Sequence, residues 1–263
     1  MQGAVKLIAL ACLVIATARG QTEPDGTRAD EPARLTPFSA APGSQPPVPW
    51  RFTSLPNKEP TRFEVVQQGA QRVLRVEADQ SYGNLVHRVR VPLGSATTLG
   101  WRWRVDQLVE DADLRNRAGD DSAAKLCVFF DFPLDRLPLI ERARLLIART
   151  TLNSELPSEA LCYVWDNKLP RGTVLVNAYT RRMRMMVLQS GLPSTGGGAW
   201  RAEHRTLLAD YRRAFADEAG GIAPDVVAVA ISADSDNTNG HGLAFFGDVT
   251  LSGPPPAPKL QGE

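Results

Sequence analysis

The chain has 263 residues, with 30 Lys and Arg against 29 Asp and Glu. A net charge this close to zero argues against a general binder of nucleic acid or of anionic membranes. The length is ordinary for one folded domain with additional terminal segments.

The N-terminus has the pattern of a secretory signal peptide. Lys6 precedes an apolar run over residues 7–16, and Ala16-Thr17-Ala18 is a small-x-small cleavage pattern. The run is shorter than the about 20 residues that cross a bilayer, which favours cleavage over an uncleaved anchor. We therefore expect residues 1–18 to be removed and the mature chain to be soluble outside the cytoplasm, with no transmembrane segment.

Composition divides the remainder into three parts. Residues 19–48 are rich in Pro, Ala, Gly and Ser and are expected to form a disordered linker. Residues 253–263 contain three consecutive prolines and are expected to form a disordered tail. Between them, residues 49–252 contain short β-type runs separated by turn signals. These runs cover 62–66, 73–77, 85–91, 99–105, 125–132, 161–165, 174–178, 183–189, 226–232 and 243–251.

Two segments between these runs have helical spacing of their apolar residues. One covers residues 137–150, and the other covers 206–217 with Thr206 as its expected cap. The run over 226–232 is apolar throughout and is expected to be a central strand covered on both faces. About ten strands with two inserted helices predict a mostly β fold, namely a jelly-roll-type β-sandwich.

Four arginines lie at alternating positions of two β-type runs: Arg88, Arg90, Arg102 and Arg104. If the two runs pair, these side chains form one cationic patch, which suits glycans that carry carboxylate or sulfate groups. The alternative is a solvated strand face whose arginines pair with nearby acids. Trp101 and Trp103 lie on the opposite face of the second run and are expected in the core.

Two cysteines remain after the expected cleavage, Cys127 and Cys162. Both lie in apolar β-type runs, so they could face each other across neighbouring strands. In an oxidising compartment they would then form a disulfide. Two buried thiols that act as small hydrophobic side chains are the other interpretation, and both stay open.

The most polar segment follows the predicted central strand. It contains Asp234, Asp236 and Asn237, and Asp248 follows later. Oxygen ligands at this density are what calcium prefers, so these four residues are a candidate structural calcium site. The alternative is a turn in which Asp and Asn side chains cap backbone amides.

A second acidic pair, Asp120-Asp121, precedes the β-type run at 125–132. Adjacent side chains on an extended backbone point in opposite directions, which disfavours a paired acid and base. The pair is a candidate ligand-binding site that could meet Asp234 or Asp236 in space. A solvated turn is the alternative.

The usual catalytic patterns are absent from the sequence. There is no GxSxG, no glycine-rich phosphate loop and no HExxH. The three histidines, His87, His204 and His241, are widely spaced and do not form a metal-ligand pattern. No catalytic residue is therefore assigned.

Six segments together resemble one family of exported bacterial proteins, which is grouped as domain of unknown function 3047. They are Trp101-Arg102-Trp103-Arg104-Val105, Gly119-Asp120-Asp121-Ser122-Ala123-Ala124, Leu161-Cys162-Tyr163-Val164-Trp165, Asp210-Tyr211-Arg212-Arg213-Ala214-Phe215, Asp234-Ser235-Asp236-Asn237-Thr238 and Phe246-Gly247-Asp248-Val249. The resemblance spans residues from about 50 to 251. It implies a periplasmic or secreted bacterial protein and a β-sandwich, and it brings no catalytic residues with it. The closing strand also resembles the last strand of galactose-binding-like sandwiches, where an acidic residue often helps to hold a structural calcium near the chain ends.

These observations favour a non-enzymatic exported domain that binds a glycan or another cell-envelope component, with a structural calcium as its candidate cofactor. A polysaccharide lyase on a jelly-roll scaffold is the first alternative. Its candidates are Arg88 and Arg90 for a uronate carboxylate, with His87 or Tyr82 as the base. A structural subunit of an envelope complex is the second.

Overall fold

The structure is a computed structural model that describes residues 34–152, 157–191, 198–218 and 220–253. Its strands form an eight-stranded and a six-stranded sheet. The eight-stranded sheet contains β1 (Arg51–Thr53), β2 (Glu59–Pro60), β5 (Ser81–Val91), β7 (Ser122–Phe130), β8 (Glu159–Asp166), β9 (Val174–Val176), β10 (Met183–Ser190) and β12 (Val226–Asp234). The six-stranded sheet contains β3 (Arg62–Gln68), β4 (Gln71–Asp79), β6 (Thr98–Gln107), β11 (Arg201–Thr206), β13 (His241–Phe246) and β14 (Thr250–Ser252).

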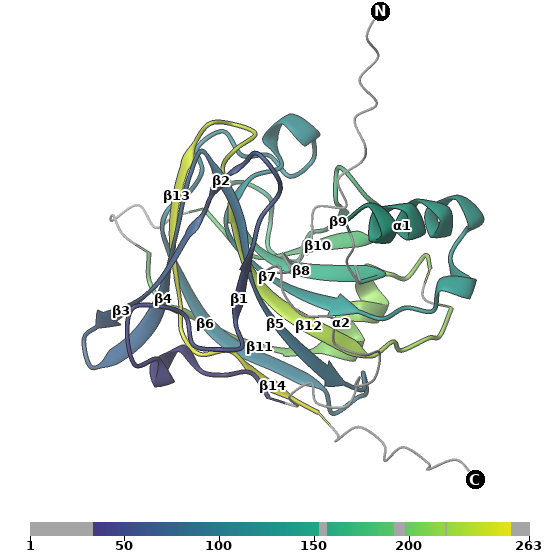
Figure 1. The fold of residues 1–263 in the computed structure, drawn as a ribbon, viewed down its shortest axis with the longest axis horizontal. Coiled ribbons are helices and arrows are strands. Elements are labelled where there is room, and N and C mark those ends of the chain that lie inside the picture. Colours follow the sequence, from purple (N-terminus) through teal and green to yellow (C-terminus); the bar gives the residue numbers. More distant parts are fainter. Residues whose placement is uncertain (1–33, 153–156, 192–197, 219, 254–263) are drawn as a thin grey trace, which may run out of the picture.

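The two sheets stack as a β-sandwich, with two inserted helices (Figure 1). The larger sheet has the strand order β1-β5-β12-β7-β8-β10-β9, with β2 also paired to β5. The smaller sheet has the order β11-β6-β13-β4-β3, with β14 also paired to β6. The helices are α1 (Leu139–Leu152) and α2 (Leu207–Ala214), and three short 3₁₀ helices are η1 (Phe38–Ala40), η2 (Arg117–Gly119) and η3 (Leu134–Arg136). The mostly β jelly-roll-type sandwich with two helices is confirmed.

Strand alternation gives the eight-stranded sheet two distinct faces. One face, called the inner face here, carries Leu126 and Val229 in the core that also contains Trp103 of the opposite sheet. The other, called the outer face, carries Cys127 and Ala228 in a second, smaller core. The outer face is the one on which the candidate site lies.

Several sequence expectations are confirmed in detail. The runs at 62–66 and 73–77 form the β3–β4 hairpin, whose turn places Gly69 at φ 59°. The run at 226–232 forms β12, which pairs with both β5 and β7 and is buried along nearly all its length. The run at 243–251 is one strand in the prediction but two in the structure, since residues 247–249 separate β13 from β14.

The expected linker ends earlier than predicted, because its second half folds against the sandwich. Leu35 and Phe38 are buried, and the Phe38 ring contacts Trp50 at 4.9 Å between centroids. The backbone N–H of Thr36 donates to His87 Nε2 at 3.1 Å. Two large apolar residues are thus buried in a segment whose composition is otherwise that of a linker. The predicted signal peptide (1–18), residues 19–33 and residues 254–263 of the predicted tail lie outside the described residues.

Neither helix of the described residues has the length and hydropathy needed to cross a membrane. Thr206 precedes α2 as expected, but its side chain makes no capping hydrogen bond. The predicted apolar face of α2 is confirmed, since Leu207, Tyr211 and Phe215 are fully buried.

Candidate functional site

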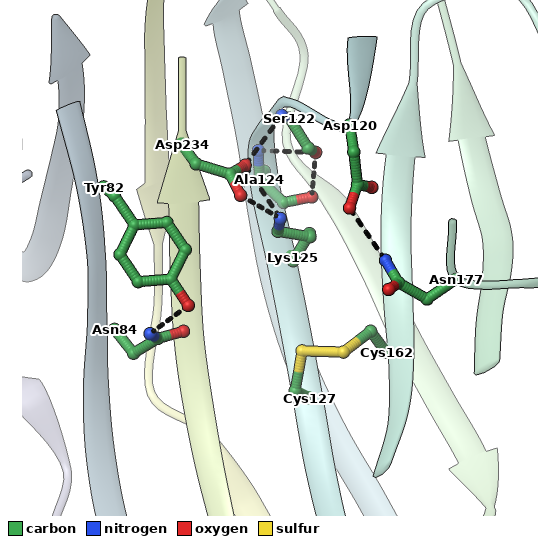
Figure 2. Close-up of a disulfide and its surroundings, with 10 residues drawn as sticks. All are labelled: Tyr82, Asn84, Asp120, Ser122, Ala124, Lys125, Cys127, Cys162, Asn177 and Asp234. Atoms are coloured by element: carbon green, nitrogen blue, oxygen red, sulfur yellow. Dashed lines mark hydrogen bonds and ion pairs between the residues drawn. A yellow bond between two sulfur atoms is a disulfide. The ribbon is translucent and has the colours of Figure 1, made fainter. Parts of the chain in front are cut away.

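A pocket of about 180 Å³ opens on the outer face of the eight-stranded sheet. Figure 2 shows its main residues as neighbours across four strands: Tyr82 and Asn84 on β5, Asp234 on β12, Lys125 and Cys127 on β7, and Cys162 on β8. Two further contributors come from loops, namely Asp120 before β7 and Asn177 after β9. Sheet register therefore gathers polar side chains that lie far apart in the sequence.

A buried ion pair forms one wall of this pocket. Lys125 Nζ donates to both carboxylate oxygens of Asp234, at 2.7 Å each, and the Ser122 backbone N–H donates to Asp234 Oδ1 at 2.9 Å. Burial raises the pKa of Asp234 to about 7, against the opposing effect of Lys125. Burial alone would lower the pKa of Lys125, but the carboxylates of Asp234 and Asp120 outweigh it and raise that pKa. The ammonium is thus held charged and fixed in place.

Asp120 presents a carboxylate oxygen that has no partner. Its Oδ2 accepts a hydrogen bond from Asn177 Nδ2 at 2.9 Å, whereas its Oδ1 is buried without a hydrogen bond. Burial raises the pKa of Asp120, with Lys125 opposing the shift. The preceding turn needs a glycine, because a Cβ at Gly119 would lie 2.8 Å from the backbone nitrogen of Asp113. That close approach fixes the position from which the Asp120 side chain enters the pocket.

Asp121 has a different role from its neighbour. Its Oδ2 accepts from the backbone N–H of Thr238 at 2.8 Å and from the Thr238 hydroxyl at 2.7 Å. Its Oδ1 accepts from the backbone N–H and from Nδ2 of Asn237, each at 3.2 Å. Asp121 therefore ties the loop after β12 to the start of β7. The backbone amide of Asn237 is capped, but by the side chain of Asp121 and not by an Asp or Asn of its own segment.

The rim of the pocket is polar and aromatic. Asp236 forms an ion pair with Lys58 through Oδ2, and its Oδ1 is buried without a hydrogen bond. The Tyr179 hydroxyl donates to the backbone carbonyl of Arg117 at 3.0 Å. On the other side, Asn84 Nδ2 donates to the Tyr82 hydroxyl at 3.1 Å. The carboxylate of Asp236 and the side chains of Tyr82 and Tyr179 thus line this part of the pocket.

The two cysteines form a disulfide that lines the pocket. Cys127 and Cys162 are directly opposite in the register of β7 and β8, and their sulfurs are bonded. Both residues line the pocket and are almost fully buried. Figure 2 shows the disulfide between them. The crosslink joins the two strands that carry the charged wall.

The four residues of the predicted calcium site come together only in part, because Asp234, Asp236 and Asn237 line one pocket and Asp248 does not. Asp234 and Asp236 precede β13 and Asp248 follows it, so an extended strand of six residues, about 20 Å long, separates them. Asp248 accepts from the backbone N–H of Ser39 at 2.9 Å and from its hydroxyl at 2.5 Å. Among the described residues, no three His, Cys, Asp or Glu side chains are grouped so that they could hold a metal ion. Calcium binding itself stays a prediction.

The four arginines do not form the patch that strand pairing would have produced. β5, with Arg88 and Arg90, belongs to the eight-stranded sheet, whereas β6, with Arg102 and Arg104, belongs to the six-stranded sheet. Arg90 forms ion pairs with Asp225 and Asp131. The guanidinium groups of Arg102 and Arg104 lie 4.6 and 5.4 Å from the ring centre of Trp200. The prediction of one cationic patch is wrong because local alternation does not say which strands share a sheet.

The residues proposed for a lyase also diverge. His87 lies on the inner face of β5, where its ring contacts Trp50 edge-on at 5.0 Å, while Tyr82 lies on the outer face. His87 Nδ1 bonds to the carbonyl of Arg88 at 2.7 Å, and burial lowers the pKa of the ring. The neutral imidazole is occupied on both nitrogens, so the histidine and the tyrosine do not face one ligand.

Sequence reasoning missed several residues of the pocket: Lys58, Asn84, Lys125, Asn177 and Tyr179. The sequence contained one indication of Lys125, because it lies within the apolar run Ala123–Phe130 and a buried lysine normally has a charged partner. The sequence contained no such indication for Asn84, Asn177 and Tyr179, because their position depends on which strands are neighbours. Asp120 lines the same pocket as Asp234 and Asp236, as suggested, whereas Asp121 bonds to the loop after β12.

Comparison with known proteins gives a family and two distant structural likenesses. The chain is 10% identical to the glycoside hydrolase domain of Endo-D from Streptococcus pneumoniae R6, with a TM-score of 0.31 over 77% of this chain and 21% of that one. It is 10% identical to an exo-beta-agarase, with a TM-score of 0.34 over 86% of this chain and 25% of that one. The chain thus spans about a quarter or less of either structure, and no functional inference follows from such scores. Curated proteins give no sequence match. The sequence model of the protein family of unknown function DUF3047 matches residues 48–250, and the chain belongs to that family.

Proposed function

We propose that this is an exported domain that binds a glycan, with one terminal sugar unit held in the pocket around Asp120. The observation that carries the proposal is the buried, unpartnered Oδ1 of Asp120 in a pocket lined by polar groups. A buried carboxylate oxygen without a donor is costly, and a ligand that donates a hydrogen bond relieves that cost. Sugar hydroxyls are such donors.

The lining offers the other groups that sugar binding uses. Asp236 adds a second unpartnered oxygen, and Tyr82 and Tyr179 add aromatic faces with hydroxyls. A volume of about 180 Å³ is below the roughly 300–1,000 Å³ of drug-sized ligand sites. One sugar unit therefore suits the pocket better than a longer segment of a chain.

The charges narrow the class of sugar. Of the described side chains that line the pocket, three are aspartates and two are lysines, and both lysines are paired with aspartates. The remaining carboxylate, that of Asp120, leaves the wall slightly negative. Neutral sugars and amino sugars fit this field, whereas uronates and sulfated sugars are repelled. This reverses the charge preference that the four arginines suggested.

Binding rather than catalysis is favoured by how firmly the charged groups are held. Asp234 is fixed by two bonds from Lys125, and Asp120 by one bond from Asn177. Fixed acceptors suit recognition because no rotamer freedom is lost when the ligand arrives. The histidine of the lyase alternative, His87, faces away from the pocket on the inner face of the sheet.

Glycan binding can be tested on the chain without residues 1–18. This form carries every residue that the structure describes in the two hydrophobic cores. We expect an array of neutral, amino and acidic glycans to show retention of neutral or amino-terminated ones. Titration calorimetry should then give about 10- to 100-fold weaker binding for Asp120→Asn, since a hydrogen bond to a charged group contributes about 1.5–3 kcal/mol.

The matched control is Asp248→Asn, the same change at a residue far from the pocket, for which we expect unchanged affinity. Equal affinity of Asp120→Asn and the unaltered chain would place the glycan elsewhere on the protein. Retention of uronates alone, or of no glycan, would contradict the proposal itself.

A further inference from the structure

Helix α1 presents its apolar residues to solvent rather than to the protein. Leu139, Ile140 and Ile147 are 82%, 67% and 57% exposed, whereas Leu145 is 3% exposed and belongs to the outer-face core. A surface helix normally buries its apolar stripe and exposes its polar one. In α1 this relation is reversed for most of the large apolar side chains that the structure describes.

Helical spacing shows that these exposed side chains form one stripe. With about 100° between successive residues, Leu139, Ile147 and Ile140 fall within an arc of about 100°. Ala143, which is also exposed, lies inside the same arc. Leu145 lies on the opposite side of the helix from the centre of this arc. The stripe therefore points directly away from the sheet.

Arginines border the stripe on both sides. The same helical spacing places Arg144 on one side of the stripe and Arg142 on the other. Both side chains are exposed. The acidic residue of the helix, Glu141, is turned towards the protein, where it forms an ion pair with Arg182 at 2.8 Å. The outward side of α1 is thus apolar in the middle and cationic at its edges.

Glu141 and Leu145 hold the helix to the body of the protein in this orientation. Leu145 packs in the core that contains Cys162 and Met183, and Glu141 reaches Arg182 just before β10. Figure 1 shows α1 beside the β8–β10 side of the sandwich, with no other helix or strand of the described residues on its outer flank. The stripe is therefore displayed by a fixed helix.

We propose that α1 docks on an anionic lipid bilayer, with its stripe in the interface and its arginines at the headgroups. An apolar face flanked by basic residues is the pattern of helices that lie in the plane of a membrane, and long basic side chains reach from there to anionic headgroups. Charge complementarity selects a bilayer over another copy of this chain, since two such faces would oppose arginine to arginine. The near-zero net charge of the whole chain does not oppose this, because only the local field acts within a Debye length of about 8 Å.

Vesicle co-sedimentation tests the proposal on the chain without residues 1–18, which removes the apolar N-terminal run. We expect the chain to sediment with vesicles of equal phosphatidylglycerol and phosphatidylcholine. The variant with Leu139→Ser, Ile140→Ser and Ile147→Ser should partition at least tenfold less. Arg142→Gln with Arg144→Gln should reduce partitioning by about fivefold for each arginine on these vesicles. On pure phosphatidylcholine the arginine pair should make no difference.

The control replaces exposed apolar residues elsewhere, Val48→Ser and Phe52→Ser, which are 85% and 46% exposed, and it should bind like the unaltered chain. An unaltered chain that stays in the supernatant would overturn the proposal. So would equal binding of the triple-serine variant. A lipid-independent dimer that the triple-serine variant abolishes would show that a second copy covers the stripe, which also overturns it.

Discussion

The eight-stranded sheet carries two buried clusters of charged side chains, one beside the pocket and one beneath α2. In the cluster beneath α2, Glu159 accepts from Arg182 at 2.9 Å and from the Tyr211 hydroxyl at 2.6 Å. Arg184 donates to the carbonyl of Ala214 at 3.0 Å and to Glu218 at 2.6 Å. Both oxygens of Glu159 are therefore paired, and the cluster connects β8, β10 and the end of α2.

The pocket cluster differs in that pairing is incomplete. Lys125 and Asp234 satisfy each other, but one oxygen of Asp120 and one of Asp236 are buried without a hydrogen bond. Burial alone thus does not mark a functional site, since both clusters are buried. Arg182 Nε and Glu141 Oε2 of the cluster beneath α2 also make no hydrogen bond, but they form an ion pair with each other at 2.8 Å. The pocket is distinguished by unpaired carboxylate oxygens on residues that line an open cavity.

The largest expected effect on stability comes from removing one partner in the cluster beneath α2. Arg182→Met removes the arginine from the buried Glu159 and from the half-buried Glu141, and we expect the free energy of unfolding to fall by about 3–5 kcal/mol. Urea denaturation followed by far-UV circular dichroism measures it. The control is Arg181→Met, whose exposed ion pair with Asp217 contributes less than about 1 kcal/mol. Equal losses in the two variants would mean that the cluster is no more stabilising than a surface pair.

Removal of Lys125 from the pocket cluster should lower the free energy of unfolding by a smaller amount. Lys125→Met is expected to lower the free energy of unfolding by about 2–3 kcal/mol at pH 8, because Asp234 becomes a buried charge without a counter-ion. The loss should shrink at pH 5. Burial already raises the pKa of Asp234 to about 7 from 3.8, and without Lys125 the folded state binds a proton more readily still. The stability loss caused by Lys125→Met is therefore present above the folded-state pKa of Asp234, and it becomes smaller as the pH decreases.

Urea denaturation of Lys125→Met and of the unaltered chain at both pH values measures this difference. A loss of stability that is the same at pH 5 and pH 8 would mean that Asp234 does not take up the proton.

Asp120→Asn should change stability and glycan binding in opposite directions. Burial raises the pKa of Asp120, which means that its ionised form is disfavoured in the fold. A neutral amide of the same shape should therefore raise the free energy of unfolding by about 0.5–2 kcal/mol at pH 7, while it weakens glycan binding. Thermal unfolding and calorimetry on the same sample give both values. A lower melting temperature would indicate that the carboxylate is structural.

The smallest expected effect is that of calcium. Lys58 and Lys125 already hold the carboxylates of Asp236 and Asp234, and Asp248 lies beyond β13. We therefore expect calcium added after EDTA to move the midpoint of thermal unfolding by less than about one degree. A rise of several degrees that is lost in Asp236→Ala would instead establish a metal site in the loop after β12, because a ligand of the native state stabilises it by mass action.

Much of the architecture could be predicted from local patterns. Period-two alternation placed Trp101 and Trp103 in the core, and the continuous apolar run at 226–232 predicted the central strand. Short strands with weak patterns were not predicted, such as β11, where charged residues alternate on an exposed strand. The folded segment at 34–48 was also missed, because only Leu35 and Phe38 interrupt its linker-like composition.

The candidate site was predicted only in part. Asp120 and Asp234 were singled out as polar residues beside apolar strands, and the structure places both in one pocket. Their partners Lys125 and Asn177 could not be identified from local patterns. The arginine prediction failed for the same reason, since residues 81–91 and 98–107 lie near each other in sequence but in different sheets.

Local patterns in the sequence are enough to predict which residues alternate, which strand is covered on both faces, and to which family the chain belongs. These properties follow from the period of the backbone and from side-chain hydrophobicity, which act over a few residues. Three features depend on the complete fold: Cys127 pairs with Cys162, Asp120 meets Lys125 and Asp234, and the apolar stripe of α1 points outward. The order of strands in a sheet is set by the best total burial of the whole chain, and no local window contains that information.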